Sequence, residues 1–254
     1  MTIDLVAFQS GLACALRGED TCPVNRNSGG FRFTGAVRRS WCELRTLSAA
    51  RAVLALVPVQ ERRRLIADYV DCGGGVAAFP ATESETLMAF LAQRLPDPSH
   101  ALTVCRMEMA LVRAQAGTVG FAPSKSSGGR ERLEMGPCAA LVWCHADPGA
   151  ISLAINGGPV PPMGAPDYPV FFAPGLPNCV RAAMAEEAVL WTRLPTSDMP
   201  TGLVRRLLAD GVITIAGPPG ELLTYGIDCQ GRGLDDAEGG IGEGQDALGM
   251  QFAI

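Results

Sequence analysis

Cysteine and histidine are the residues of this sequence best suited to nucleophilic or metal chemistry. Nine cysteines are scattered along the chain, mostly inside apolar runs such as LACAL and LVWCH, and only two histidines are present, His100 and His145. Neither a CxxC nor an HExxH spacing occurs, so the sequence predicts no self-contained zinc or iron site. The cysteines are expected to be reduced, buried thiols of a cytoplasmic protein.

A cysteine nucleophile would need a histidine beside it as a base. His145 follows Cys144 directly, and neighbouring residues of a strand point to opposite faces, so this pair is not expected to act together. Cys138 or Cys179 could meet His145 in the folded chain. An independent enzyme therefore stays open as an alternative, although no nucleophile elbow and no paired carboxylates at catalytic spacing support it.

Negative charge is concentrated in the last part of the sequence. Residues 217–254 hold seven acids against one base, a net charge of −6, whereas the whole chain carries −5, so residues 1–216 are nearly neutral at +1. Glycine is frequent in this acidic tail, which shows no periodicity and is expected to be flexible. Gly242, Gly244 and Ala247 match a loose GxGxxA pattern, but no strand precedes them, so a dinucleotide site is not expected.

The composition is that of a soluble globular protein. Hydrophobic residues make up 48% and charged residues 19% of the chain, and no apolar run approaches the roughly 20 residues that span a membrane. The beginning of the sequence is too mixed for a secretory signal, with Asp4 where a basic region belongs. We expect a cytoplasmic protein without membrane contact.

Helical spacing dominates the first half of the sequence, which predicts a helical domain over residues 1–116. Thr82 is expected to cap one helix, with Glu85 completing a capping box, and Asp97 to cap another that has Pro98 at its first position. The predicted helices cover residues 3–17, 35–57, 59–72, 81–95 and 98–116.

Short strands and turns follow, and they predict a small second domain over residues 117–216. The expected strands are ERLEMG, AALVWCHA, ISLAING, YPVFFAP and VRAA, with a DPG turn between the second and the third. The fold class is therefore α+β: an N-terminal helical domain, a small C-terminal winged-helix-like domain with a short antiparallel sheet, and the acidic tail.

Residues 186–215 predict a helix, a turn, a second helix and a strand, the order found in winged-helix domains. A DNA reader of this kind needs a basic face, because neutralised phosphates supply most of its affinity. Residues 178–216 contain four arginines against four acids, and only Arg205 and Arg206 are well placed. The balance disfavours nucleic acid as a partner, and a winged-helix DNA-binding regulator is kept as the alternative.

An exposed strand edge beside a helix can instead accept an extended peptide as an additional strand. The helix–turn–helix segment would place Trp191, Arg193, Arg205 and Arg206 along such a groove, and these are the candidate peptide-binding residues. The alternative for each is ordinary: Trp191 in the core and the arginines in solvent.

Two stretches resemble a group of bacterial partner proteins. HALTVCRMEMALVRAQAG is similar to the helix that closes their N-terminal domain, and YPVFFAPGLPNCVRAAMAEEAVLWTRL and LVRRLLADG are similar to the run leading into and through their winged helices. The resemblance is carried by Arg106, Glu108, Ala110, Arg113, Ala114, Val180, Arg181, Glu186, Glu187, Ala188 and Leu190. Met109 stands where the family has an aromatic residue, and the acidic tail is a second departure.

Proteins of this group accompany multinuclear non-haem iron enzymes with a TIM-barrel fold, which modify ribosomally made peptides, as in methanobactin and 3-thiaglutamate biosynthesis. The resemblance implies a subunit without catalytic residues that binds the leader of a precursor peptide and presents the peptide's cysteine to its partner in a heterodimer. Iron is then expected in the partner enzyme and no cofactor in this chain.

Arg106 and Arg113 are the candidate partner-binding residues, because they lie seven positions apart beside one apolar stripe. A salt bridge to Glu108 or to another neighbour is the alternative role for each.

Overall fold

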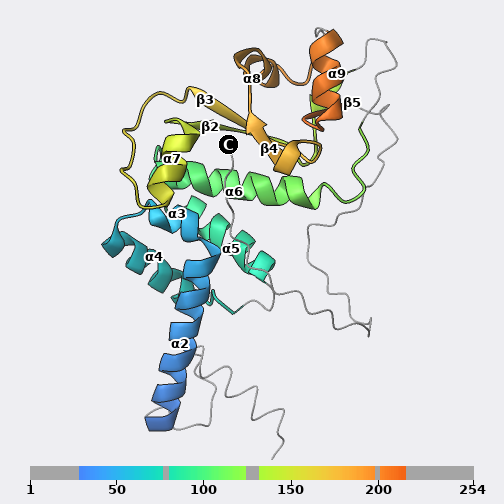
Figure 1. The fold of residues 1–254 in the computed structure, drawn as a ribbon. Helices are drawn as coiled ribbons and strands as arrows, with labels where there is room; N and C mark the ends of the chain where they lie inside the picture. The colour runs from blue at the N-terminus through green and yellow to red at the C-terminus, as the bar shows by residue number, and fades with distance from the viewer. Residues whose placement is uncertain (1–28, 77–79, 124–131, 198–200, 216–254) are drawn as a thin grey trace, which may run out of the picture.

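The computed structural model describes residues 29–76, 80–123, 132–197 and 201–215. Helices and sheets are both present, so the chain is of mixed α+β class (Figure 1). The first half is helical and the second half carries two small antiparallel sheets together with short helices. None of the described helices combines the length and the apolar character needed to cross a bilayer.

Five helices build the first half in the order that the sequence predicts. They are α2 (Gly29–Ala49), α3 (Arg51–Ala55), α4 (Val59–Asp71), α5 (Pro80–Ala92) and α6 (His100–Ala116). The single helix expected over 35–57 is divided at Ala50, whose φ and ψ of −123° and 32° are not helical. The helix expected over 3–17 lies outside the described residues.

Both predicted helix caps in this half are wrong. α5 begins at Pro80, so Thr82 lies inside the helix rather than at its cap. α6 is capped by Ser99, whose hydroxyl accepts a hydrogen bond from the Leu102 N–H at 3.1 Å. Asp97 instead forms a salt bridge with Arg106 across the first turns of the helix, at 2.9 Å. Serine and aspartate are equally good caps, and the path of the chain decides between them.

α6 is the central helix of the fold. It packs against α3 and α5 on one side and against the sheet of β2 (Ala140–Cys144) and β3 (Tyr168–Phe172) on the other. Ten of its residues are buried, from His100 to Ala114. The main apolar core therefore runs through residues on both sides of the predicted boundary at 116/117, and includes Val142 and Phe172 of the sheet.

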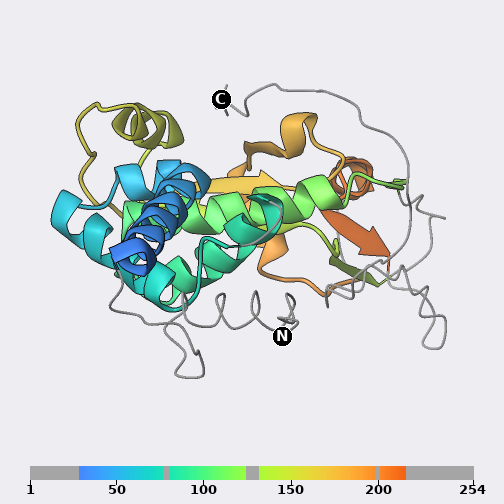
Figure 2. The same ribbon diagram turned by 90° about the horizontal axis from the view of Figure 1, so that it is seen from below.

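The three-stranded sheet has the order β2–β3–β4, with β4 at Val180–Ala182, and all its pairs are antiparallel. Its middle strand is buried on both faces, because alternate side chains of a strand point in opposite directions. Val170 and Phe172 belong to the main core with α6, whereas Phe171 belongs to a second core. Figure 1 shows the sheet above α6 and below α8, and Figure 2, seen from below, shows α9 and β5 beside the C-terminal end of α6.

The predicted strand ISLAING is wrong, because this segment is helical. α7 spans Pro148–Ile155, between β2 and β3. The DPG sequence that suggested a turn instead starts the helix: the Asp147 carboxylate accepts a hydrogen bond from the Ala150 N–H at 3.0 Å, and Pro148 occupies the first helical position. These are the preferred residues of a helix start.

The second core holds the closing elements α8 (Ala185–Trp191), α9 (Thr201–Ala209) and β5 (Ile213–Ile215). Gly211, with φ at +70°, ends α9 as predicted and turns the chain into β5. β5 then pairs with β1 (Leu133–Met135) from the beginning of this half, which makes a separate two-stranded sheet. The single short sheet of the prediction is thus two sheets.

Candidate functional site

The side chains predicted to bind a peptide lie in two different environments. Trp191 ends α8 and is half-buried, with its ring centroid 5.5 Å from that of Phe171. Arg193 and Arg205 are exposed. Arg206 is held by the carboxylate of Glu187 at 2.7 Å. Trp191 therefore lies at the rim of the second core, and Arg206 is exposed like Arg193 and Arg205 but forms an ion pair with a buried carboxylate.

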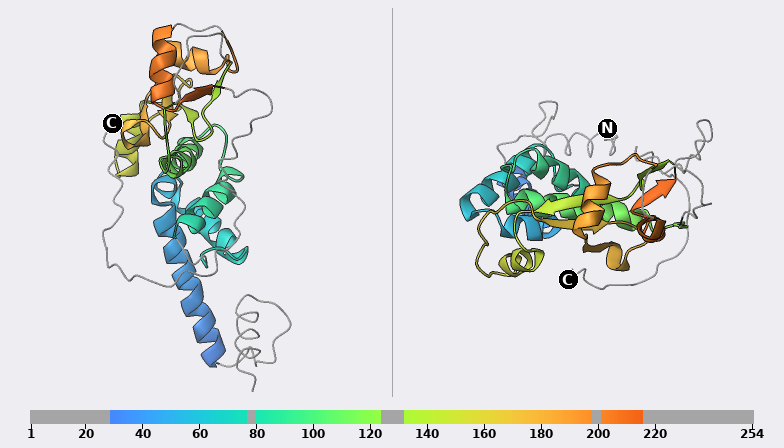
Figure 3. Two further views of the ribbon diagram at one scale, coloured as in Figure 1. Left: turned by 90° about the vertical axis from the view of Figure 1, so that its right-hand side faces the viewer. Right: turned by 90° about the horizontal axis from the view of Figure 1, so that it is seen from above.

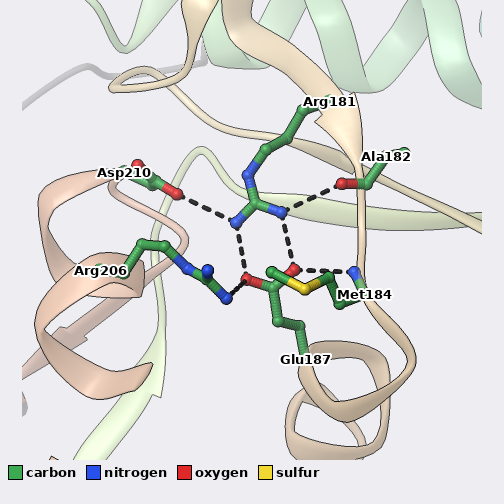
Figure 4. A network of polar contacts seen from close by, with 6 residues as sticks. All are labelled: Arg181, Ala182, Met184, Glu187, Arg206 and Asp210. Atoms are coloured by element: carbon green, nitrogen blue, oxygen red, sulfur yellow. Dashed lines mark hydrogen bonds and ion pairs between the residues drawn. The ribbon is translucent and has the colours of Figure 1, made fainter. Parts of the chain in front are cut away.

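Glu187 is the centre of that network, which joins β4, α8 and α9 (Figure 4). Its side chain is 0% exposed and accepts hydrogen bonds from Arg181 at 2.7 and 2.9 Å, from Arg206 at 2.7 Å and from the Met184 N–H at 2.8 Å. Arg181 also contacts Asp210, at 3.0 Å. A buried carboxylate with four donors is well compensated for the loss of its hydration.

The electrostatics of the network follow from burial and from these donors. Burial by itself would raise the pKa of Glu187, but the hydrogen bonds from Arg181 and Met184 and the charges of Arg181 and Arg206 outweigh it, so the pKa of this carboxyl is lowered. Glu187 therefore remains ionised in the folded protein. Two of the four arginines in residues 178–216 are thus paired with a buried carboxylate, although the Arg206 side chain remains 45% exposed.

The two arginines predicted to bind a partner protein lie on the exposed side of α6. Arg106 pairs with Asp97 at 2.9 Å, with both side chains more than half exposed, and Arg113 is exposed near the end of the helix. A surface pair of this kind contributes little to stability. Between them, Glu108 is half-buried, and burial raises its pKa to about 7.

One strand edge in the second half is open, and this feature was not predicted residue by residue. Leu133 of β1 lies opposite Ile215 of β5 in the register, but its main-chain groups point to the other edge. There its N–H donates to the Thr196 oxygen at 2.8 Å and its oxygen accepts from the Thr196 N–H at 3.1 Å. Alternate residues of an antiparallel strand turn their main-chain groups to the same edge, so Met135 is the next to face outward. Among the described residues, none pairs with Met135 at this edge.

A small pocket lies at this open edge. It has a volume of about 190 Å³ and is lined by Glu134, Met135, Leu194 and Pro195. The segment that pairs with Leu133 at Thr196 also supplies Leu194 and Pro195 to the lining of this pocket. The Met135 side chain is 54% exposed. The sequence contained one sign of this pocket, the proline directly after Leu194, which indicates a turn rather than a continuing strand.

The cysteines are thiols in the structure, and the most deeply placed are poor nucleophiles. Burial raises the pKa of Cys105 to about 12 and that of Cys144 to about 11, so the reactive thiolate is scarce at neutral pH. Of the six described cysteines, Cys72 is exposed and Cys138 half-buried, which departs from the prediction that all are buried.

Both histidine side chains form hydrogen bonds with the segment that connects α7 and β3. The His100 Nε2 lies 2.9 Å from the Pro161 carbonyl oxygen, and the His145 Nδ1 lies 3.0 Å from that of Gly164. His145 is thus turned to this connection, while the buried Cys144 sulfur lies 3.9 Å from the Met107 sulfur. As the sequence predicts, Cys144 and His145 are not arranged as a nucleophile and its base. In the described part of the chain, no three or more acidic, cysteine or histidine residues gather as a metal site.

Searches against family models, curated proteins and solved structures gave no match. The open edge of β1, with its pocket, is therefore the candidate site on the strength of its own geometry.

Proposed function

We propose that this protein is a non-catalytic partner subunit that binds the leader of a ribosomally made precursor peptide by strand addition and presents the peptide's cysteine to a multinuclear non-haem iron enzyme. The observation that carries the proposal is the open outer edge of β1 at Met135 beside a pocket of about 190 Å³. Main-chain hydrogen bonds at such an edge give affinity, and a neighbouring pocket gives selectivity for a side chain.

The chemistry of the site suits an extended peptide with an apolar residue opposite the pocket. Met135, Leu194 and Pro195 supply apolar walls, and the Met135 N–H and C=O are placed to exchange hydrogen bonds with one residue of the incoming strand. The exposed Arg193 directly precedes Leu194 in the chain, so a cation stands beside the entry. An acidic leader residue next to the docked apolar one would be favoured.

The iron chemistry belongs to the partner in this proposal, a TIM-barrel enzyme. This chain then acts by holding one end of the substrate, which lowers the entropic cost of bringing the peptide's cysteine to the metal. The order of α8, α9 and β5 is the one in which the family resemblance places its winged helices.

The alternative, a winged-helix DNA-binding regulator, is weakened by the ion-pair network. Because Arg181 and Arg206 are paired with Glu187, only Arg193 and Arg205 among the arginines of residues 178–216 lie outside this network. Typical DNA-binding proteins neutralise about 6–10 phosphates, and the described surface of α9 supplies far fewer charges.

The test begins with affinity purification of the tagged full-length protein from its native cells, followed by mass spectrometry and an iron assay. We expect an iron-containing enzyme in near-equal amount and a bound peptide. That peptide, resynthesised with a fluorescent label, is then titrated with the wild-type protein by anisotropy. Recovery of the protein alone, without iron or peptide, would contradict the proposal.

Two substitutions at Met135 locate the peptide. Met135→Pro removes the outward N–H but leaves the ladder with β5, which uses the Glu134 pair and the Gly136 N–H. We expect the dissociation constant to rise about tenfold or more, the equivalent of one lost hydrogen bond with local clash. Met135→Ala keeps the N–H and should change the dissociation constant by only about threefold. Equal effects of the two variants would argue against strand addition.

A further inference from the structure

α2 has two apolar faces, and only one of them is covered by the described residues. The covered face rests on α4 and α5 through Cys42 and Thr46, which are 5% and 0% exposed. The opposite face carries five large apolar side chains, 38–71% exposed, at spacings of three and four residues: Phe33, Val37, Trp41, Leu44 and Leu47. These five are called the α2 stripe below. Helices that are apolar on both sides are normally covered on both sides.

The position of α2 makes the exposure of the stripe costly. The helix extends away from the other described elements over its first turns (Figure 3). Isolated helical turns are not stable in water without tertiary packing, and a contiguous row of aromatic and aliphatic side chains is a typical contact surface. A second helix along the stripe would supply the missing packing.

We infer that the α2 stripe is the docking site of residues 3–17 of the same chain, which lie back along α2 as the first helix of an antiparallel hairpin. The pattern of this segment fits, since Leu5, Phe8, Leu12 and Leu16 recur at spacings of three and four residues and form one narrow apolar seam on a helix.

The lengths also fit. Fifteen helical residues are about 22 Å long, and the stripe from Phe33 to Leu47 covers about 21 Å. Residues 18–28 connect the two segments, and eleven residues can span up to about 36 Å. Because the connection is short and ends where α2 begins, the local concentration of the segment at the stripe is high.

Two other occupants fit less well. A second copy would place α2 against α2, and each brings four arginines against one glutamate, a net charge of +3, so the flanks repel. The acidic tail has the complementary charge, but its 38 residues begin just after β5, which ends at Ile215 beside the other core. A longer connection lowers the local concentration, and the tail lacks apolar residues at helical spacing along its length.

Trp41 provides the test, because it lies in the middle of the stripe and is 63% exposed to solvent in the absence of a cover. In a full-length protein carrying Trp143→Phe and Trp191→Phe, it is the single tryptophan. We expect acrylamide to quench it about threefold less than it quenches the same protein with Leu12→Asp, because a docked helix shields the indole ring. Ser10→Asp adds the same charge on the opposite side of the segment and should leave Trp41 shielded.

Each contrary result has a distinct meaning and overturns the inference. Strong quenching of Trp41 in the full-length single-tryptophan protein would show that the stripe is open. Shielding that increases with protein concentration, together with a dimeric mass by light scattering, would assign the stripe to a second copy. Shielding that is lost on removal of residues 217–254, and is unaffected by Leu12→Asp, would assign it to the tail.

Discussion

Replacement of Glu187 by glutamine is expected to destabilise the protein strongly. One carboxylate oxygen of Glu187 accepts from Arg181 and Arg206, and the other accepts from Arg181 and the Met184 N–H. When the glutamine amide nitrogen replaces either carboxylate oxygen, two of these four hydrogen bonds are lost. The amide N–H groups then face the N–H groups of the former donors. Hydrogen bonds to charged groups contribute about 1.5–3 kcal/mol each, while Asp210 and solvent partly satisfy the arginines. We therefore expect a loss of about 3–4 kcal/mol in unfolding free energy.

The assay is urea unfolding followed by circular dichroism and by the fluorescence of Trp191, which lies in the same core. With a slope near 3 kcal/mol per molar urea, the midpoint of Glu187→Gln should fall by about 1 M. Glu186→Gln is the matched control, because Glu186 is the exposed neighbour in the same helical turn, and it should change stability by less than about 0.5 kcal/mol.

The pH dependence gives a second readout of the same interaction. The pKa of Glu187 is lowered in the folded protein, so its stabilising contribution is present above the ordinary pKa of a glutamate and is lost as the pH falls through the lowered value. The difference between wild type and Glu187→Gln should shrink in acid. Equal stabilities of Glu187→Gln and Glu186→Gln at pH 7 would refute the reasoning.

Two further predictions concern other charged residues, Glu108 in α6 and the arginines of α9. Burial raises the pKa of Glu108 to about 7, so the wild type should lose stability as the pH rises from about 4.5 to 7. Glu108→Gln should remove this loss and be about 2 kcal/mol more stable than the wild type at pH 8. Thermal unfolding measured across this pH range tests both expectations. Arg206→Glu sets a carboxylate against Glu187 and should destabilise the fold as much as Glu187→Gln in urea. Arg205→Glu is the matched control and should alter the unfolding free energy by less than about 0.5 kcal/mol. A stable Arg206→Glu protein, or a flat pH profile for wild type, would contradict the respective argument.

The order of elements was readable from the sequence wherever the apolar pattern was long or the turn residues were distinctive. α4 and the strands β2 and β3 lie close to the predicted segments, because their spacing is unambiguous over several residues. The strand prediction for ISLAING was wrong for the opposite reason, because a short apolar run is compatible with a strand or with a helix. The Asp147 side chain decided the outcome by capping the helix.

The residues of the candidate site were not predicted. The peptide-binding hypothesis expects an exposed strand edge in the second half, and among the described residues none pairs with Met135 at the outer edge of β1. The sequence predicts Arg206 as peptide-binding or, in the alternative, solvated, since nothing in it shows that Arg181, Glu187 and Arg206 meet. They are brought together by the packing of α8 and α9 over β4.

The sequence by itself determined the α+β class, most of the helices and strands, and the separation of a nearly neutral body from an acidic tail, because periodicity and charge are local properties. The tertiary structure decided what those properties are used for. It made Arg206 a partner of the buried Glu187, and among the described residues it leaves Met135 unpaired at the outer edge of β1 and covers only one face of α2. Each of these depends on which distant segments come into contact, and contacts at long range are set by the packing of the whole chain.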